Sequence, residues 1–471
     1  MPISRRDSPQ TLVEDCVQWA QNRIHGQVFR PGMRLPSIRA LARDRGISPF
    51  TVVEAYERLV ASGYLESRKG SGFYVRERNT GSQPAAGHPR ARIDLNWLMR
   101  NMLADSAARG PGLGVLPASW LDGVQLGAAL RSIGRQSAGA WLESGKPLGF
   151  EPLRSVLQQR LAARDILARP AQIVLTTGIT HALDLVLRIL VGSDDTVLVL
   201  DPCWFGALGM LAARGIRTVG VPCTSAGPDL AAMERLAKEE KPRLLIINSS
   251  AQNPTGASLS GDAVRRILDI AARFDFLIFE DDVYTDLCGS PAVSLAASDQ
   301  LNRVIYAASF SKTLASNIRV GYIACRPELA ESLAETKILS GFTTPEINER
   351  LVHKLLVEGR YTRHVRTLRD RLAECRVKTR ATLSRRGVDV LGDPSDGMFL
   401  WVNMHTDTDE LAVSCREKGL LLAPGSLFSP HQTASTWMRL NMTTPAEAIA
   451  QCLHHAESSR SACSDYGVLR S

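Results

Sequence analysis

The segment Ser309-Phe-Ser-Lys-Thr-Leu-Ala-Ser-Asn-Ile-Arg-Val-Gly321 places one lysine, Lys312, in a polar turn between two apolar runs. The runs are Val304–Phe310 and Val320–Cys325, and both are typical of buried strands. Because burying an unpaired ammonium is costly, a lysine at such a position loses proton affinity and becomes a nucleophilic amine. The segment therefore predicts covalent chemistry with a carbonyl group, although a lone lysine is more often an ordinary surface residue.

From Gln172 onward, short β-branched or leucine-rich runs alternate with helical patterns. This alternation predicts an α/β fold, a parallel sheet with helices on both faces, which binds ligands beyond the carboxyl ends of its strands. The predicted strands are Ile173–Thr176, Val197–Leu200, Thr218–Val221, Leu244–Ile247 and Leu277–Glu280, and the predicted helices are Thr180–Leu190, Leu208–Arg214, Leu230–Lys238 and Asp262–Phe274.

The residues that follow these strands form a chemically coherent set. A helix N-terminus after the first strand offers backbone amides and a hydroxyl to a phosphate. Later strands are followed by an aromatic ring, an amide, a carboxylate with a phenol, and finally the lysine. Together these groups suit pyridoxal 5'-phosphate. The set comprises Gly178, Ile179, Thr180, Trp204, Asn253, Asp281, Tyr284 and Lys312.

Each member has an expected role. Lys312 and Asp281 are the catalytic candidates, because Lys312 would bind the aldehyde and Asp281 would keep the pyridine nitrogen protonated. Trp204 would stack on the ring unless it belongs to the core. Asn253 and Tyr284 would bind the ring oxygen. The phosphate is expected to contact Gly178, Ile179, Thr180, Ser309 and Arg319, and Ser311 either joins this cofactor site or only shapes the turn.

Arg439 lies in the strand-like string Trp437-Met-Arg-Leu-Asn441. An arginine there suits the α-carboxylate of a substrate, because its guanidinium can donate two parallel hydrogen bonds. The competing interpretation is a structural ion pair.

Asn253-Pro-Thr-Gly256 and Ser309-x-Ser-Lys312 with Arg319 resemble the fold-type I aminotransferases of class I/II over residues 92–458. The resemblance implies a large α/β/α domain and a small α+β C-terminal domain from about residue 345. Two positions depart from it. Ser144 stands where relatives carry a tyrosine that reaches the partner subunit's phosphate. Asp396 stands where a glycine pair lies near the substrate, and it is expected to alter or abolish ordinary amino-acid binding.

The first 78 residues carry 13 Lys/Arg against 8 Asp/Glu, so most of the net charge of +8 lies near the N-terminus and indicates a polyanionic partner. Helical patterns cover Leu12–His25, the residues after Pro36 and the residues after Ser48-Pro49, a strong helix start. A basic hairpin follows at Tyr64–Ser67 and Gly72–Arg76. This order predicts a winged helix-turn-helix.

Pro31–Arg39, Thr51–Tyr56, Gly63–Leu65 and Gly70–Val75 closely resemble the DNA-binding domain of GntR-type regulators. The resemblance implies double-stranded operator DNA as a partner. Pro49 departs from it, since many relatives carry an arginine there, and one contact is expected to be absent. The residues expected to bind DNA are Ser37 and Arg39 at phosphates, Ser48, Phe50 and Thr51 at the head of the recognition helix, and Lys69 and Gly70 at the wing tip.

A head at residues 1–78, a Gly/Pro/Ser-rich linker at 79–91 and a body at 92–458 resemble the MocR-like subfamily of regulators. The resemblance implies a homodimer in which each head lies over the partner's body. It also implies a transcriptional regulator that senses an amine or amino acid. The alternative is a working aminotransferase whose head is of secondary importance. The polar tail, 459–471, has no clear period and is expected to lack regular structure.

Several other classes are disfavoured. Nine scattered cysteines without a Cys-x-x-Cys or His-Glu-x-x-His motif indicate reduced thiols in a cytoplasm and no metal site. The chain has no membrane-length apolar run and no signal-peptide core at its start. Ser309-x-x-Lys312 also fits serine-lysine acylases, but their Ser-Asp-Asn and Lys-Thr-Gly motifs are missing. No phosphate-binding Gly-x-x-x-x-Gly-Lys-Ser/Thr motif is present.

Overall fold

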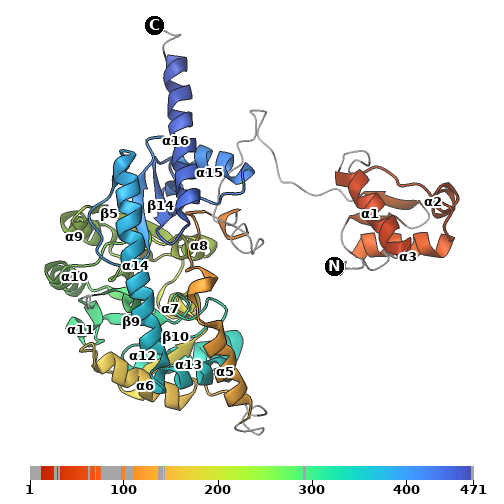
Figure 1. The fold of residues 1–471 in the computed structure, drawn as a ribbon. Helices are drawn as coiled ribbons and strands as arrows, with labels where there is room; N and C mark the ends of the chain where they lie inside the picture. Colours follow the sequence, from red (N-terminus) through yellow and green to blue (C-terminus); the bar gives the residue numbers. More distant parts are fainter. Residues whose placement is uncertain are drawn as a thin grey trace, which may run out of the picture. The chain divides into compact units, whose positions relative to one another are not determined.

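The computed structural model divides into two compact units, Met1–Arg90 and Ala91–Ser471 (Figure 1). The predicted linker lies outside the described residues, as do Lys69 and Gly70 of the predicted wing tip. The described residues are 12–25, 29, 32–61, 64–68, 71–75, 97–100, 110–135, 142, 144–289 and 293–467.

The N-terminal unit has the predicted order of three helices and a hairpin. Tyr56 is fully buried between them, and its hydroxyl donates a hydrogen bond of 3.0 Å to the carbonyl of Pro36. Residues 32–35 also pair with the second strand of the hairpin, so the wing has three extended segments. The elements are α1 (Leu12–His25), α2 (Ile38–Arg45), α3 (Pro49–Ala61), β1 (Leu65–Arg68) and β2 (Gly72–Val75).

The C-terminal unit is built on an eight-stranded sheet of order β3-β10-β9-β8-β7-β4-β5-β6. The prediction of a parallel sheet was incomplete, because β10 runs antiparallel to both β3 and β9. Only eleven residues, 310–320, join β9 to β10, and a parallel crossover needs a dozen or more. The strands are β3 (Ile173–Thr176), β4 (Thr196–Asp201), β5 (Arg217–Thr224), β6 (Gly227–Pro228), β7 (Leu244–Asn248), β8 (Leu277–Asp281), β9 (Val304–Ser309) and β10 (Gly321–Ala324).

Helices cover both faces of this sheet, as expected. Figure 1 shows α9, α10 and α11 along one side and α7 and α8 along the other. The predicted helices and strands are present, with ends shifted by at most three residues. The helices are α5 (Gly123–Gly134), α6 (Glu151–Ala162), α7 (Ile179–Leu190), α8 (Phe205–Ala213), α9 (Leu230–Glu240), α10 (Gly261–Arg273), α11 (Leu295–Asp299), α12 (Pro327–Gly341) and α13 (Glu346–Val357).

A second, antiparallel sheet of order β11-β12-β14-β13 packs with the last helices around its own apolar core. The long helix α14 joins the two cores, since Tyr361 and Val365 belong to the main core and Leu383 to the small one. The elements are α14 (Arg360–Arg385), β11 (Asp389–Val390), β12 (Phe399–Asn403), α15 (Thr408–Glu417), β13 (Ala423–Pro424), β14 (Trp437–Asn441) and α16 (Ala446–Gly467).

The expectation for the tail was wrong up to Gly467, because α16 continues through residues 459–467. No proline or glycine interrupts the sequence between Ala446 and Gly467, so nothing in it stops the helix earlier. Among the helices that the structure describes, none has the length and hydrophobicity needed to cross a membrane.

Candidate functional site

The strand ends converge as the sequence predicted. Strands β4, β7, β8 and β9 are parallel neighbours, and β3 has the same direction because β10 lies antiparallel between β3 and β9. Their carboxyl ends therefore meet at one edge of the sheet. The residues at or just after these ends are Gly178 (β3), Trp204 (β4), Asn253 (β7), Asp281 (β8) and Lys312 (β9).

Lys312 has a perturbed amine. Its Nζ donates a hydrogen bond of 2.6 Å to the carbonyl of Gly114 and lies 5.9 Å from the centre of the Tyr284 ring. Burial lowers the pKa of Lys312 to about 8; nearby Arg439 adds to the decrease and Asp281 opposes it. Much more of this amine is therefore neutral near pH 7 than of an exposed lysine.

Asp281 is buried, and no cation of the described part of the chain is bonded to its carboxylate. One carboxylate oxygen accepts a hydrogen bond of 3.2 Å from the amide of Val283, and the Asn248 side chain donates one of 2.9 Å to the Asp281 carbonyl. Burial raises the pKa of Asp281 to about 7. A protonated nitrogen placed against this carboxylate would stabilise its charged form. The sequence reasoning missed Asn248, whose role depends on pairing between β7 and β8.

The expected phosphate site surrounds the start of α7. Gly178 precedes the helix with φ +90°, and a Cβ there would lie 3.1 Å from the Arg319 guanidinium. Arg319 Nη2 donates a hydrogen bond of 2.5 Å to the carbonyl of Thr177. On the other side of Thr177, its amide donates to His181 Nδ1 at 3.1 Å. Ile179 is half-buried and Thr180 is exposed in the first turn. The sequence reasoning missed His181.

The two serines of the lysine turn bond to each other. Ser309 Oγ donates to Ser311 Oγ at 2.9 Å and to the Val320 carbonyl at 3.1 Å. These bonds fix the turn around Lys312, so the role of shaping the turn is available to both hydroxyls.

Arg439 is the most deeply buried cation near the lysine, with 1% of its surface exposed. Its Nη1 donates to Asn253 Oδ1 at 3.0 Å and its Nη2 to the Gly112 carbonyl at 2.6 Å, while its buried Nε has no partner among the described residues. Burial lowers the pKa of Arg439 to about 10. No Asp or Glu forms an ion pair with it in the described part of the chain, so an anionic ligand would find an unpaired guanidinium here.

The two aromatic candidates are fixed by packing. Trp204 is half-buried, and its ring lies across Gly206 so closely that a Cβ there would be 2.3 Å from the indole. Gly206, another residue that the sequence reasoning missed, is thus required by the position of the ring. Tyr284 is buried, packs edge-on against Phe399 with ring centres 5.6 Å apart, and has its pKa raised by burial.

Two positions, Ser144 and Asp396, differ from the aminotransferase pattern. Ser144 is exposed. Asp396 accepts hydrogen bonds from the Gly289 amide at 2.6 Å and from Ser395 Oγ at 2.8 Å. Its carboxylate is therefore engaged with the loop at Gly289.

The donor set fits pyridoxal 5'-phosphate. A lysine whose pKa is lowered, a buried carboxylate to which no described cation is bonded, and an arginine beside a helix N-terminus match the aldehyde, the ring nitrogen and the phosphate in chemical character. The unpaired Arg439 supplies a further position for a carboxylate.

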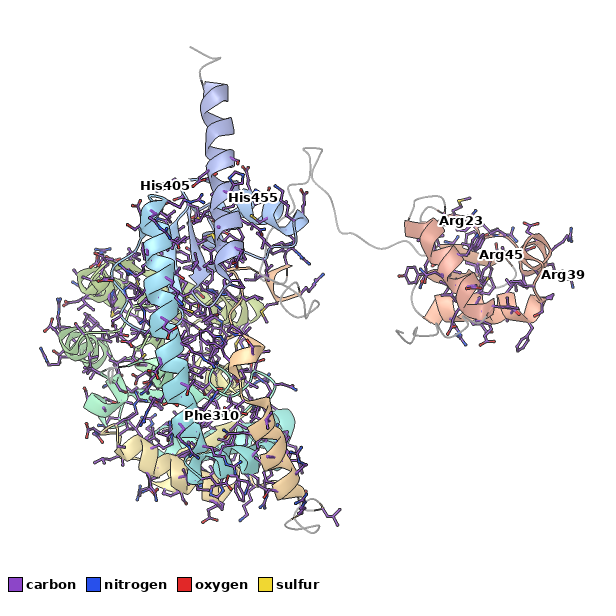
Figure 2. The ribbon with its side chains drawn as sticks, viewed as in Figure 1. Arg23, Arg39, Arg45, Phe310, His405 and His455 are labelled. Atoms are coloured by element: carbon purple, nitrogen blue, oxygen red, sulfur yellow. The ribbon has the colours of Figure 1, made fainter. Side chains whose placement is uncertain are left out.

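On the N-terminal unit, the predicted DNA-binding residues begin two helices. Ser37 Oγ accepts from the Ala40 amide at 3.2 Å and caps α2, and Ser48 Oγ accepts from the Thr51 amide at 3.0 Å and contacts the Thr51 hydroxyl at 2.8 Å. Phe50 is 77% exposed in the first turn of α3. Figure 2 shows Arg39 on α2, and this side chain is exposed.

Two family models match this chain. Residues 122–455 match aminotransferase class I and II, and residues 16–75 match bacterial regulatory proteins of the gntR family. The HTH-type transcriptional regulator YdcR of Escherichia coli, described as uncharacterized, is 28% identical over 91% of this chain and 94% of its own. A 2-aminoadipate transaminase of Thermus thermophilus is 31% identical over 64% of this chain and 77% of its own.

Among solved structures, LysN, the α-aminoadipate aminotransferase of Thermus thermophilus complexed with N-(5'-phosphopyridoxyl)-L-leucine, is similar with a TM-score of 0.69 and 28% identity. The similarity covers 76% of this chain and 93% of that one.

Proposed function

The chain belongs to the aminotransferase class I and II family and joins to it a GntR-type head, the MocR-like architecture, and on this premise we propose that it regulates transcription in response to a ligand bound at Lys312. Its family depends on pyridoxal 5'-phosphate, and its head is a DNA-binding module. The observation that carries the proposal is the pairing of a lysine whose pKa is lowered with a buried carboxylate whose pKa is raised, both at one sheet edge.

When bound, pyridoxal 5'-phosphate supplies an aldehyde conjugated to an electron-withdrawing ring. Lys312 binds the aldehyde covalently, and Asp281 holds a proton at the ring nitrogen. Trp204 stacks on the ring, and Asn253 and Tyr284 bind the ring oxygen. The phosphate contacts are assigned to Gly178, Ile179, Thr180, Ser309, Ser311 and Arg319, and the ligand carboxylate to Arg439.

The head is assigned to operator DNA through seven residues. Arg39 and Ser37 bind phosphates, and the start of α3 enters the major groove, as in other helix-turn-helix proteins. Lys69 and Gly70 are assigned to the wing tip. The full DNA-binding set is Ser37, Arg39, Ser48, Phe50, Thr51, Lys69 and Gly70. Residues 79–91 tether this head, 1–78, to the body, 92–458, and 459–471 form the tail.

The regulator acts as a cytoplasmic homodimer. A single winged helix gives limited affinity, whereas two heads on paired half-sites gain from tethering. Exposed apolar side chains in the last turn of α12, Leu339 at 89%, and directly after it, Phe342 at 62%, offer a surface for the second copy. The ligand controls the heads by binding one arrangement of the dimer better than the other.

The test uses the full-length protein, reduced with borohydride and digested. Mass mapping should find the phosphopyridoxyl group on Lys312 and on no other lysine, and Lys312→Ala should abolish the label. Operator affinity is then measured with and without an amino acid. A protein that never acquires the label, or whose operator affinity ignores both cofactor and amino acid, would contradict the proposal.

A working aminotransferase is the second candidate, because Lys312, Asp281 and Arg439 are all present beside a sheet edge suited to the chemistry. It predicts release of a keto acid over many turnovers. One half-reaction without turnover favours the regulator instead.

A further inference from the structure

A strap of six residues, Gly110–Val115, crosses the site and presents its carbonyls to the buried polar groups. The Gly112 carbonyl accepts from Arg439 at 2.6 Å and the Gly114 carbonyl from Lys312 at 2.6 Å. The Leu113 and Val115 carbonyls both accept from the Asn441 amide at 2.9 Å. The strap therefore has a defined position relative to the lysine turn and β14.

Close backbone packing keeps the strap there. A Cβ on Gly110 would lie 2.5 Å from the Leu421 carbonyl oxygen, and one on Gly112 would lie 2.4 Å from the Leu422 carbonyl carbon. Only glycine permits this approach to the chain before β13. The strap is therefore held in place by the packing of the C-terminal unit.

A cavity of about 390 Å³ opens between the strap with its following residues, the lysine turn and the residues after β14. This volume falls within the range of small-molecule sites, about 300–1,000 Å³. Lys312 is one of the lining residues, so the cavity adjoins the residue that would hold the cofactor. The side chain of a bound amino acid has this space to enter.

Among the residues that the structure describes, the lining is uncharged apart from that lysine. Its apolar members include Leu113, Val115, Leu116, Pro117 and Leu121. A ligand side chain that enters the cavity would therefore be surrounded mainly by hydrocarbon.

Apart from Ser316, which is exposed, the uncharged polar side chains of the described lining form hydrogen bonds within the protein. Asn441 uses its amide on the strap, and its Oδ1 accepts from the Thr443 amide at 3.0 Å and the Thr443 hydroxyl at 2.8 Å. Thr444 Oγ1 donates to the Gly110 carbonyl at 3.4 Å, and Ser311 Oγ accepts from Ser309. These groups have little capacity left for a charged ligand, and burying an unpaired charge is costly.

We infer that this cavity receives an uncharged, mainly apolar amino-acid side chain, so the ligand is a neutral amino acid whose only two charges meet Arg439 and the cofactor site. The inference rests on the function proposed above. After bonding Asn253 and Gly112, Arg439 keeps a buried Nε without a partner among the described residues, and this N–H is the donor left for a carboxylate. Lys312 is engaged by the cofactor site, so a second carboxylate or a second ammonium on the ligand meets no other opposite charge among the described lining residues.

The test compares ligands of matched shape on the cofactor-loaded, full-length protein. L-norleucine is paired with L-lysine, and L-glutamine with L-glutamate, and binding is measured by calorimetry and by the change in cofactor absorbance. The neutral member of each pair should bind at least about tenfold more tightly, because the charged one loses hydration without gaining a partner.

Variants at the wall provide a matched check. Val115→Lys puts a cation into the cavity and should tighten L-glutamate binding by about tenfold through a charge-assisted contact; the neutral Val115→Thr should leave the preference unchanged. If Val115→Lys does not fold, Leu121→Arg with Leu121→Gln as its control replaces the pair.

The outcomes separate the two proposals. Equal or tighter binding of the charged ligands by a protein labelled at Lys312, or binding of none of the four, overturns the neutral-ligand inference and leaves the cofactor site standing. A protein without a label at Lys312 overturns the proposed function, and the inference fails with it.

Discussion

At the scale of single residues, the amine of Lys312 offers a direct pH test. Burial lowers its pKa to about 8, whereas an exposed lysine titrates at about 10.4. Only the neutral amine attacks an aldehyde, and a lowered pKa means that the proton leaves at lower pH. We predict that capture of pyridoxal 5'-phosphate by cofactor-free protein accelerates about tenfold per pH unit below pH 8 and levels off above it.

The measurement is borohydride trapping of the label on Lys312 as a function of time between pH 6 and pH 10. Lys312→Ala supplies the background, and an exposed lysine such as Lys238 in the same digest supplies the reference for free cofactor chemistry. A capture rate that keeps rising to the pH range of that exposed lysine would show that the amine is not perturbed.

His181 allows a second test at this scale. Its Nδ1 accepts the Thr177 amide at 3.1 Å, while Arg319 donates to the Thr177 carbonyl at 2.5 Å, so the residue before Gly178 is held from both sides. Burial lowers the pKa of His181, with Lys337 and Arg319 adding to the decrease, and keeps it a neutral acceptor. His181→Leu should weaken cofactor binding about fivefold, the value of roughly one hydrogen bond.

His181→Gln is the matched control, because an amide oxygen can accept the same bond and should restore most of the affinity. Both dissociation constants come from absorbance titrations. If the two variants bind the cofactor equally, the Thr177 amide does not need this acceptor.

These residues show how far sequence reasoning reaches. Lys312, Asp281, Asn253 and Arg439 were predicted because each follows or lies on a strand and carries unusual chemistry. His181, Gly206 and Gly112 were not predicted, because His181 bonds a backbone group and the two glycines leave space for a side chain or backbone that packs against them. Such roles arise only when distant segments meet, and nothing in the local pattern marks them.

At the scale of elements, α2 and α3 present the head to DNA. Arg39 is exposed on α2 and belongs to no described ion pair. A phosphate contact contributes one released counterion. Arg39→Ala should therefore weaken binding to all DNA sequences alike and reduce the slope of log K against log[salt] by about one. Titrations of specific and random duplexes at several salt concentrations measure both effects.

Arg58→Ala is the control for Arg39. Arg58 is also exposed, but it lies in the last turn of α3 and pairs with Glu54 at 2.7 Å. Arg58→Ala lowers the net charge by the same amount as Arg39→Ala, but it should change the slope of log K against log[salt] less. If Arg39→Ala instead weakened binding only to duplexes that carry one particular operator base, Arg39 would recognise that base and would not contact a phosphate.

Elements were predicted well where apolar period and turn residues agree, as in α3 after Ser48-Pro49 and in β3 before Gly178. The direction of β10 was not predicted, because it depends on the length and path of the turn that contains Lys312. The strap was not predicted either. Gly110–Val115 has no regular period, and its conformation is set by hydrogen bonds to Arg439, Lys312 and Asn441.

At the scale of the whole molecule, the proposed dimer needs an apolar surface. Ile338, Leu339, Phe342 and Ile347 lie within ten residues of one another at the α12–α13 connection, with between 38% and 89% of their surfaces exposed. Phe342 has φ +65°, a strained conformation for a bulky residue. Such a concentration of exposed apolar groups marks an interaction surface more often than a solvated one.

The double variant Leu339→Asp/Phe342→Asp should therefore be a monomer with an intact cofactor site. A monomer brings one head to DNA, so its affinity for an operator with two half-sites should fall by about 100-fold, and its affinity for a single half-site should not change. Sedimentation measures the mass, and titrations of the two duplexes measure the affinities. Leu167→Asp, at a residue that is 70% exposed away from this connection, is the matched control and should remain a dimer. A double variant that stays dimeric would place the interface elsewhere, while a monomer that keeps the full two-site affinity would show that tethering of the heads contributes nothing to operator binding.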